Sequence, residues 1–304
     1  SAFWACSGLT SVTLSNSLTS INDGLFDSCT GLTSIEIPNS VTSIEDEAFA
    51  GCSSLSSVTI PNSVIIVGQA AFAGTPWFDN QPDGLVYVGL AAYEDKGTIP
   101  DGTSINLKDG TASVSDYAFA YNSGLTSITL PNSVIAIGVA AFQECSGLTS
   151  LTLPNSVASI GQWAFRDCSS LSSVEIPESV TAVGYAAFSG TPWYNNQPDG
   201  VVYAGLALYA YKGTMPDATS IILKDGTVSI TDYAFGNRSG LTSVTLPNPL
   251  TTIGMEAFSE CSGLTTLTIP GSVTFIGDGA FWDCRGLTDV YSYIADLSKV
   301  KNGR

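Results

Sequence analysis

The chain contains no histidine, and its basic residues are scarce. Its 304 residues include 10 lysines and arginines against 27 aspartates and glutamates, a formal net charge of −17 with a pI near 4.1. Without histidine, a Ser-His-Asp triad, a Cys-His dyad and histidine-ligated metal centres are excluded. Binding to nucleic acid or to an anionic membrane surface needs clustered lysine and arginine. We therefore expect no nucleic-acid partner, and without a glycine-rich nucleotide fingerprint we expect no cofactor.

Long apolar segments are also missing. A membrane-spanning helix needs about 20 consecutive apolar residues, and the longest candidate, residues 63–74, is shorter than that. We therefore expect no membrane insertion. No signal peptide is found, and the chain opens in the middle of a repeat, without the polar cap of a terminal repeat. These features predict a fragment of a longer chain whose export signal and anchor lie outside it.

What the sequence does contain is a fixed period. Cys29 follows Cys6 by 23 residues, Cys52 follows Cys29 by 23, and a phenylalanine stands three residues before each of them. A period of about 20–30 residues is the mark of a solenoid, in which every repeat forms one coil. The residues that keep this spacing, with two gaps, are Cys6, Cys29, Cys52, Cys145, Cys168, Cys261 and Cys284, and Phe3, Phe26, Phe49, Phe72, Phe119, Phe142, Phe165, Phe188, Phe235, Phe258 and Phe281.

One repeat, LTSIEIPNSVTSIEDEAFAGCSS at residues 32–54, predicts the structure of a coil. Alternation of polar and apolar residues predicts a strand over residues 34–37, which Pro38 ends because it has no amide donor. A second extended piece is predicted over residues 41–44, followed by a single α- or 3₁₀-helical turn over residues 46–52. No coil could fold alone, so each needs neighbours on both sides.

A second period of 116 residues is superimposed on the first. Cys145 follows Cys29 by 116 residues, and Cys261 follows Cys145 by the same number. Within each block, one step between phenylalanines is 47 residues instead of 23, as from Phe72 to Phe119. Each block therefore carries an insert, and the likeness of the two inserts implies a tandem duplication.

The inserts lie at about 75–103 and 191–219. Each has an Asp-Gly turn signal and two short apolar runs, around Gly89 and Gly205, which predict a β-hairpin. Because each coil of a solenoid contacts only its neighbours, we expect one continuous domain over residues 1–304.

These motifs carry a family resemblance. The run LTSLTLPNSVASIGQWAFRDCSS at residues 148–170 resembles the BspA-like class of leucine-rich repeats, and similar runs recur about eleven times. The resemblance implies a right-handed leucine-rich-repeat solenoid of 23-residue coils, each with a strand, a turn and a short helix, and a parallel main sheet. It also implies a secreted or surface-anchored bacterial protein that adheres to other cells. Residues 289–304 depart from the repeat pattern.

The cysteines have two interpretations. They could form disulfides or bind metal, but the chain has no CxxC motif and an odd number of cysteines. We favour a buried structural ladder of thiols, one per coil, and expect no metal site. At the same position in other coils stand Thr75, Asn122, Thr191 and Arg238.

Two carboxylate pairs are the remaining catalytic candidates. Glu144 and Asp167 precede consecutive ladder cysteines, as do Glu260 and Asp283, so each pair is expected to lie about one coil apart. Some glycosidases hold two carboxylates at a similar separation, ~5–5.5 Å. Solvated surface acids are the favoured interpretation, and a carbohydrate-cleaving enzyme is the remote alternative. We expect the chain not to be an enzyme.

Two surfaces are candidates for binding. The first is the outward row of the long strands, which is rich in serine and threonine and which we expect on a broad concave face. An inert scaffold is the favoured interpretation of this row, because threonine suits strands and small hydroxyl groups stack without strain. The second is the aromatic side chains of the inserts, since aromatics in a loop that leaves a regular scaffold suit recognition. The candidate ligand-binding residues are Phe78, Tyr87, Tyr93, Tyr194, Tyr203, Tyr209 and Tyr211.

An alternative interpretation of the inserts is structural. Trp77 and Trp193, each fixed by a preceding proline, are expected to fill the gap where the coil geometry breaks. For the tyrosines both interpretations stay open. The sequence thus predicts a monomeric, non-enzymatic module that binds protein or glycan partners at a bacterial surface, with a structural stalk as the alternative.

Overall fold

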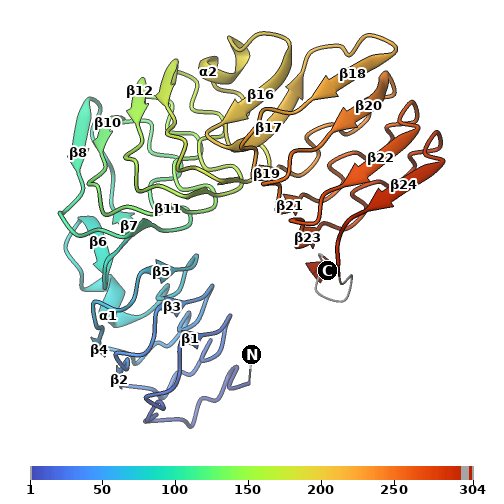
Figure 1. Cartoon of the computed structure of the whole chain (residues 1–304). Coiled ribbons are helices and arrows are strands. Elements are labelled where there is room, and N and C mark those ends of the chain that lie inside the picture. The colour runs from blue at the N-terminus through green and yellow to red at the C-terminus, as the bar shows by residue number, and fades with distance from the viewer. Residues whose placement is uncertain (1, 296–300, 303–304) are drawn as a thin grey trace.

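Each 23-residue repeat forms one coil of a parallel β-solenoid (Figure 1). The structure is a computed structural model that describes residues 2–295 and 301–302. A typical coil contains a longer strand, a shorter strand and a run of turns, and successive coils are stacked so that equivalent residues pair. Ser34, for example, pairs with Ser57, 23 residues further on.

The longer strands lie close to the predicted positions. In β2 the side chain of Ile35 is buried, while Ser34 and Glu36 point outward, which confirms the alternation in the sequence. The longer strands are β2 (Ser34–Glu36), β4 (Ser57–Thr59), β8 (Thr103–Asn106), β10 (Leu125–Thr129), β12 (Ser150–Thr152), β14 (Ser173–Glu175), β18 (Thr219–Ile222), β20 (Leu241–Thr245), β22 (Thr266–Ile269) and β24 (Asp289–Ser292).

The shorter strands form the larger sheets. One sheet has the order β1-β3-β5, and two six-stranded sheets have the orders β15-β13-β11-β9-β7-β6 and β16-β17-β19-β21-β23-β25. The shorter strands are β1 (Ser20–Ile21), β3 (Ser43–Ile44), β5 (Ile66–Val67), β9 (Ser113–Val114), β11 (Ala136–Ile137), β13 (Ser159–Ile160), β15 (Ala182–Val183), β19 (Ser229–Ile230), β21 (Thr252–Ile253), β23 (Phe275–Ile276) and β25 (Lys301–Asn302).

The longer strands do not form the single main sheet that the sequence predicts. They pair only in twos, as β2 with β4 and β12 with β14. Figure 1 shows the reason: the coils follow an arch, with the shorter strands along its inner side and the longer strands along its outer side. Neighbouring coils are closer together on the inner side of an arch, so hydrogen-bonded pairing extends further there. The expectation of a concave serine/threonine face is therefore wrong.

The predicted helical turn of each coil is also wrong. Residues 46–52 form consecutive turns, and Glu47 has a left-handed φ of 53°. This conformation directs backbone amides along the solenoid axis. The amides of Glu47 and Phe49 donate to the carbonyls of Gln69 and Ala71 in the next coil, at N–O distances of 2.9 and 2.8 Å. Hydrogen bonds between coils thus replace the bonds that a helix would make within one coil.

Phenylalanine rings form a stacked column through the interior. The rings of Phe3, Phe26, Phe49 and Phe72 follow one another at centroid separations of 5.5, 5.5 and 5.3 Å, with nearly parallel planes. Similar columns run from Phe119 to Phe188 and from Phe235 to Phe281. Such offset aromatic stacking adds to the free energy gained by burying the rings themselves.

The cysteines form the predicted ladder beside this column. Cys52 is fully buried, and its thiol donates to the carbonyl of Phe26, with Sγ and O 3.1 Å apart. Cys29, Cys145, Cys168 and Cys261 are buried in the same way, Cys284 is half-buried and Cys6 is exposed, and all seven are free thiols. Burial raises the pKa of the Cys145 thiol to about 12, so the thiol stays protonated and unreactive.

Each insert replaces the side of one coil with a short helix and a hairpin. The first contains α1 (Pro76–Asp79), β6 (Gly84–Val88) and β7 (Ala91–Lys96), and the second contains α2 (Pro192–Asn195), β16 (Gly200–Ala204) and β17 (Ala207–Lys212). Within each insert the two strands pair antiparallel. The second strand then pairs parallel with the following coil, β7 with β9 and β17 with β19. The hairpin therefore continues the sheet of shorter strands.

The pairing of strands persists where the sequence drifts from the repeat. β24 pairs in parallel with β22, with Thr266 opposite Asp289, and β25 pairs with β23. Residues 296–300 and 303–304 of the drifting segment lie outside the described residues.

The coils approach one another most closely at a recurring glycine. A Cβ atom on Gly161 would lie 2.5 Å from the carbonyl carbon of Gly138 in the preceding coil. We expect Gly161→Ala to lower the free energy of unfolding by about 1–3 kcal/mol, since the backbone must shift to admit a methyl group. Urea unfolding followed by circular dichroism measures this. In the control Gly8→Ala, where no atom lies within 4 Å, stability should be unchanged, and equal stabilities of the two variants would contradict the close approach.

Candidate functional site

The two tryptophans of the inserts pack against the last phenylalanine before each break in the column. The Trp77 ring lies 4.7 Å from that of Phe72, and the Trp193 ring lies 4.6 Å from that of Phe188. Both tryptophans are half-buried. This placement agrees with the structural interpretation of these side chains.

Three of the predicted ligand-binding residues are largely buried. Tyr93 is 1 % exposed, Tyr209 4 % and Phe78 9 %. The Tyr93 hydroxyl accepts a hydrogen bond from the Phe72 amide at 3.2 Å, and Tyr209 does the same for the equivalent amide of the second block. Desolvation by burial raises the pKa of both tyrosines. Phe78 and Tyr93 thus lie in the core, where their rings meet edge to face with centroids 5.7 Å apart.

Tyr87 and Tyr203 accept hydrogen bonds from two backbone amides that are absent from most coils, where proline stands instead. Coils such as the one containing Pro131 carry proline after the longer strand, whereas the coils after the inserts carry Lys108 and Lys224. The Tyr87 hydroxyl accepts a hydrogen bond from the amide of Lys108 at 3.0 Å, and Tyr203 accepts one from Lys224 at 2.8 Å. These two tyrosines compensate for the additional amide of the lysine.

The remaining predicted residues meet other side chains in one pocket. This pocket, with a volume of about 250 Å³, lies between the second insert and the coils on either side of it. We call it the tyrosine pocket, and its main lining residues are Tyr185, Tyr194, Tyr209, Tyr211, Tyr233 and Arg238.

Two exposed rings form the rim of the tyrosine pocket. The rings of Tyr185 and Tyr233 have centroids 5.0 Å apart and planes inclined at 58°, and the two residues are 39 % and 38 % exposed. Deeper in the pocket, the rings of Tyr194 and Tyr209 meet edge to face at 5.5 Å. The pocket therefore presents aromatic faces to solvent above a packed aromatic base.

Charged groups of both signs border the aromatic faces. Arg238, at the position of a ladder cysteine, donates from Nη2 to the carbonyl oxygen of Tyr211 at 2.9 Å, and its guanidinium carbon lies 5.6 Å from the Tyr211 ring centre. Asp232 also lines the pocket, and its Oδ1 accepts a hydrogen bond from the amide of Met255 at 2.6 Å. Burial raises the pKa of Tyr194, while Arg238 opposes this shift.

Tyr185 and Tyr233 were not predicted from the sequence as pocket residues. They stand at variable positions of two ordinary coils, 48 residues apart in the chain. The contact arises because β17 contacts β15 on one side and pairs with β19 on the other in the stacked structure. In the sequence, these two residues could have been found only by comparing the two blocks residue by residue.

The two carboxylate pairs come together at the surface as predicted. Glu144 and Asp167 border one open hollow with Tyr121, and Glu260 and Asp283 border the equivalent hollow of the second block. Glu144, Asp167 and Glu260 are exposed. This placement fits solvated surface acids.

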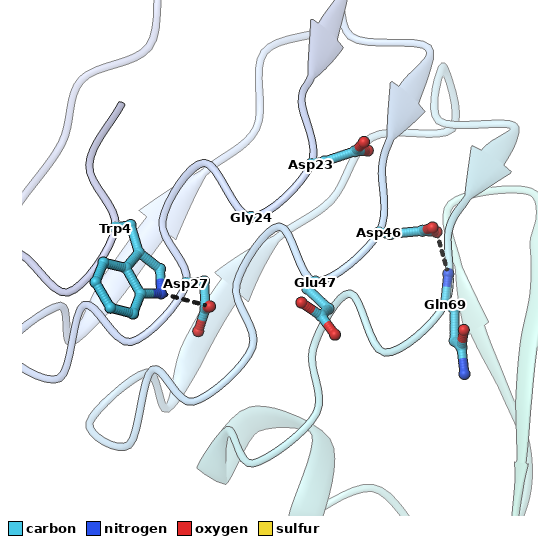
Figure 2. Close-up of a pocket in the computed structure, with 7 residues that line it drawn as sticks. All are labelled: Trp4, Asp23, Gly24, Asp27, Asp46, Glu47 and Gln69. Atoms are coloured by element: carbon cyan, nitrogen blue, oxygen red, sulfur yellow. Dashed lines mark hydrogen bonds between the residues drawn. The ribbon is translucent and has the colours of Figure 1, made fainter. Parts of the chain in front are cut away.

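A third hollow, not predicted from the sequence, lies over the turns of the first coils. Its volume is about 530 Å³, and Asp23, Asp27, Asp46 and Glu47 border it. Figure 2 shows that two of these acids are already engaged: Trp4 Nε1 donates to Asp27 Oδ2 at 2.9 Å, and the Gln69 amide donates to Asp46 Oδ1 at 2.7 Å. Within residues 2–295, no group of three or more acids or thiols is arranged to hold a metal ion.

The outward row of the longer strands consists mostly of serine and threonine, with the exposed Ile222 and Tyr291 among the exceptions. Ser127, Thr129, Ser150 and Thr152 border a hollow of about 330 Å³ on this row. The side chains are small and hydroxylated, so the row offers hydrogen bonds but few of the aromatic or arginine side chains that dominate binding energy.

The repeat sequence matches a known family model. Six copies of the BspA type leucine rich repeat region match residues 1–80, 97–196 and 206–302. The chain belongs to this BspA-type family. Between these ranges, residues 81–96 and 197–205 are unmatched, and both stretches fall within the inserts.

Solved structures of other leucine-rich repeat proteins are similar to this BspA-type chain. One, from Bacteroides ovatus, is 25 % identical with a TM-score of 0.38, and the match covers 94 % of this chain and 78 % of that one. A leucine rich cell surface protein from Faecalibacterium prausnitzii is 25 % identical with a TM-score of 0.31, covering 93 % and 84 %. A leucine rich repeat protein from T. pallidum is 24 % identical with a TM-score of 0.30, covering 70 % and 80 %.

No curated protein matches this BspA-type chain at a significant level. In the part of the chain that the structure describes, neither helix has the length and apolar character needed to cross a membrane.

The pairing of Tyr87 with Lys108 makes a specific prediction. We expect Tyr87→Phe to lower the free energy of unfolding by about 0.5–1.5 kcal/mol, because the Lys108 amide loses its acceptor. Lys108→Pro introduces the residue of an ordinary coil, which has no amide hydrogen. In this background the loss of the hydroxyl in Tyr87→Phe should not lower the free energy of unfolding through a lost hydrogen bond. Urea unfolding of the four proteins of this double-mutant cycle measures the coupling. If Tyr87→Phe lowers the free energy of unfolding equally in both backgrounds, the proposed hydrogen bond between Tyr87 and the Lys108 amide is contradicted.

Proposed function

We propose that the chain is a non-enzymatic binding module of a bacterial cell-surface or secreted protein, which recognises protein or glycan partners. The observation that best supports this is the tyrosine pocket, where two partly exposed tyrosine rings stand beside an arginine. Tyrosine and arginine are enriched among residues that dominate binding energy. Their concentration on an otherwise serine- and threonine-rich surface favours this place as the centre of contact.

The repeat architecture supports a binding role in a second way. Leucine-rich repeat proteins generally mediate protein binding, and a solenoid presents an extended surface built from stacked coils. The formal net charge of −17 keeps such an array soluble and suppresses non-specific association with nucleic acid. The surface or secreted location is proposed from the family.

The proposal of a non-enzymatic role rests on the chemistry of the side chains. The chain has no histidine, and Glu144, Asp167 and Glu260 are exposed to solvent. An enzyme needs groups whose pKa values are tuned by burial and by neighbours, and full solvation works against that tuning.

A structural stalk is the second candidate. The observation that favours it is the outward row of the longer strands, mostly serine and threonine, which offers few anchors for a partner. A stalk would display another domain and would itself bind nothing.

Binding of the labelled chain to an array of host matrix proteins and glycans tests the proposal. We expect a saturable signal on at least one class of partner at micromolar protein, a signal that excess unlabelled chain removes. If no spot gives a signal at protein concentrations up to 100-fold higher, the binding-module proposal is rejected and the structural stalk remains as the candidate function.

A further inference from the structure

The two duplicated blocks differ at the tyrosine pocket. The residues 116 positions before Tyr185, Tyr194, Tyr211 and Arg238 are Gln69, Phe78, Asp95 and Asn122. The surrounding framework is the same in both blocks: Tyr93 and Tyr209 accept equivalent hydrogen bonds, and Asp116 and Asp232 each accept an amide of the next coil. On the same scaffold, the second block thus carries Tyr185, Tyr211 and Arg238 where the first block carries Gln69, Asp95 and Asn122.

Packing explains part of these replacements, since the Tyr211 ring packs against the core with its centre 6.1 Å from that of the Phe235 ring, but it does not explain the exposed Tyr185. Asp95 and Tyr211 both donate their amides to the following coil, to the carbonyls of Ala118 and Ala234 at 2.9 and 2.8 Å, so the backbone tolerates either side chain. Tyr185 is 39 % exposed and replaces a glutamine. An exposed tyrosine gains little stability for the fold, and its apolar face is instead available to a ligand.

The dimensions of the pocket limit the ligand to a small ring. Its volume of about 250 Å³ is below the range of about 300–1,000 Å³ that is typical of pockets for drug-sized molecules. Its rim consists of the inclined rings of Tyr185 and Tyr233, with centroids 5.0 Å apart. A flat, partly apolar ring can lie against one of these faces and keep its polar edge toward the charged groups.

The charges of the pocket favour a neutral ligand that both donates and accepts hydrogen bonds. Arg238 can only donate, and Asp232, with one oxygen engaged by Met255, can accept through the other. Because Arg238 and Asp232 both line the pocket, a ligand charged with either sign meets a like charge as well as an opposite one, and the net charge of −17 further disfavours an anion. The hydroxyl groups of a sugar satisfy both kinds of partner, while the C–H face of the sugar ring suits an aromatic surface.

We propose that the tyrosine pocket binds one neutral sugar residue of a glycan, stacked on Tyr185 or Tyr233 and hydrogen-bonded to Arg238 and Asp232. This assignment rests on the proposed function and names its ligand class. The first block, with Gln69 and Asp95 at the corresponding positions, lacks the site.

The test uses the whole chain and a panel of neutral monosaccharides and short neutral oligosaccharides. Saturation-transfer NMR with irradiation of the aromatic protons identifies the sugars that bind, and titration gives their affinities. The variant Tyr185→Gln/Tyr211→Asp carries the residues of the first block at two pocket positions. We expect it to bind the best sugar at least tenfold more weakly, with a thermal unfolding midpoint close to that of the unaltered chain.

The matched control is Tyr121→Asn. Tyr121 is 60 % exposed and lies outside the tyrosine pocket, and its counterpart in the second block is Asn237. Like the pocket variants, Tyr121→Asn replaces a tyrosine with the residue found at the equivalent position of the other block. We expect this variant to keep the full affinity for the sugar. The single variant Tyr185→Gln, which changes only an exposed side chain, provides the test if the double variant does not fold.

Each outcome decides the assignment. Weaker sugar binding in the pocket variants alone supports it. Three results overturn it: no neutral sugar binds at millimolar concentration, the pocket variants bind as tightly as the control, or the pocket prefers an aromatic peptide. If no neutral sugar binds but a protein partner binds the chain and its pocket variants equally well, the assignment fails while the proposed binding function stands.

Discussion

Contact between equivalent residues of successive coils is the constraint on which this structure depends. The amide of Phe49 bonds to the next coil, the ring of Phe49 stacks on two other phenylalanines, and the thiol of Cys52 donates to the preceding coil. Each of these contacts joins residues about one repeat apart. Since no coil buries its own apolar face, stability is shared between neighbours, and close approach at Gly161 leaves no room for a side chain.

The inserts show how the molecule departs from the repeat without losing that contact. β7 takes the place of a shorter strand, and the amide of Leu90 donates to the carbonyl of Val64 in the preceding coil at 2.8 Å. The missing phenylalanine is compensated by Trp77 and Tyr93, whose rings pack against Phe72. Trp77 and Tyr93 of the first insert therefore pack within the scaffold, while Tyr194, Tyr209 and Tyr211 of the second insert line the tyrosine pocket.

Repetition made part of the fold predictable. The period placed the buried phenylalanines and cysteines correctly, because a residue that recurs in every coil must occupy a similar environment in each. The turn over residues 46–52 was predicted as helical because its alanine, glutamate and phenylalanine suit a helix. The sequence does not indicate the left-handed φ at Glu47. That conformation is stabilised by hydrogen bonds to the next coil, which lie outside the single repeat. The curvature is likewise a property of the stack, so the arch was not predictable from one repeat.

The candidate site was only half visible in the sequence. Tyr194, Tyr209 and Tyr211 were identified as insert aromatics, yet the same reasoning also selected Tyr87 and Tyr93, which serve the scaffold. Composition does not distinguish a ring that faces the core from one that faces solvent. Tyr185 and Tyr233 reach the pocket only because their coils are stacked next to the second insert. No pattern within a single repeat indicates this.

Thiol reactivity under native conditions tests most directly whether equivalent side chains share a dry interior. With Ellman's reagent, Cys6 should react at once and Cys284 more slowly, while Cys29, Cys52, Cys145, Cys168 and Cys261 should react only when the chain unfolds. Mass spectrometry of the labelled peptides assigns each site. Labelling of Cys52 or Cys145 in the folded chain at the rate of Cys6 would contradict the stacked ladder and the architecture inferred from it.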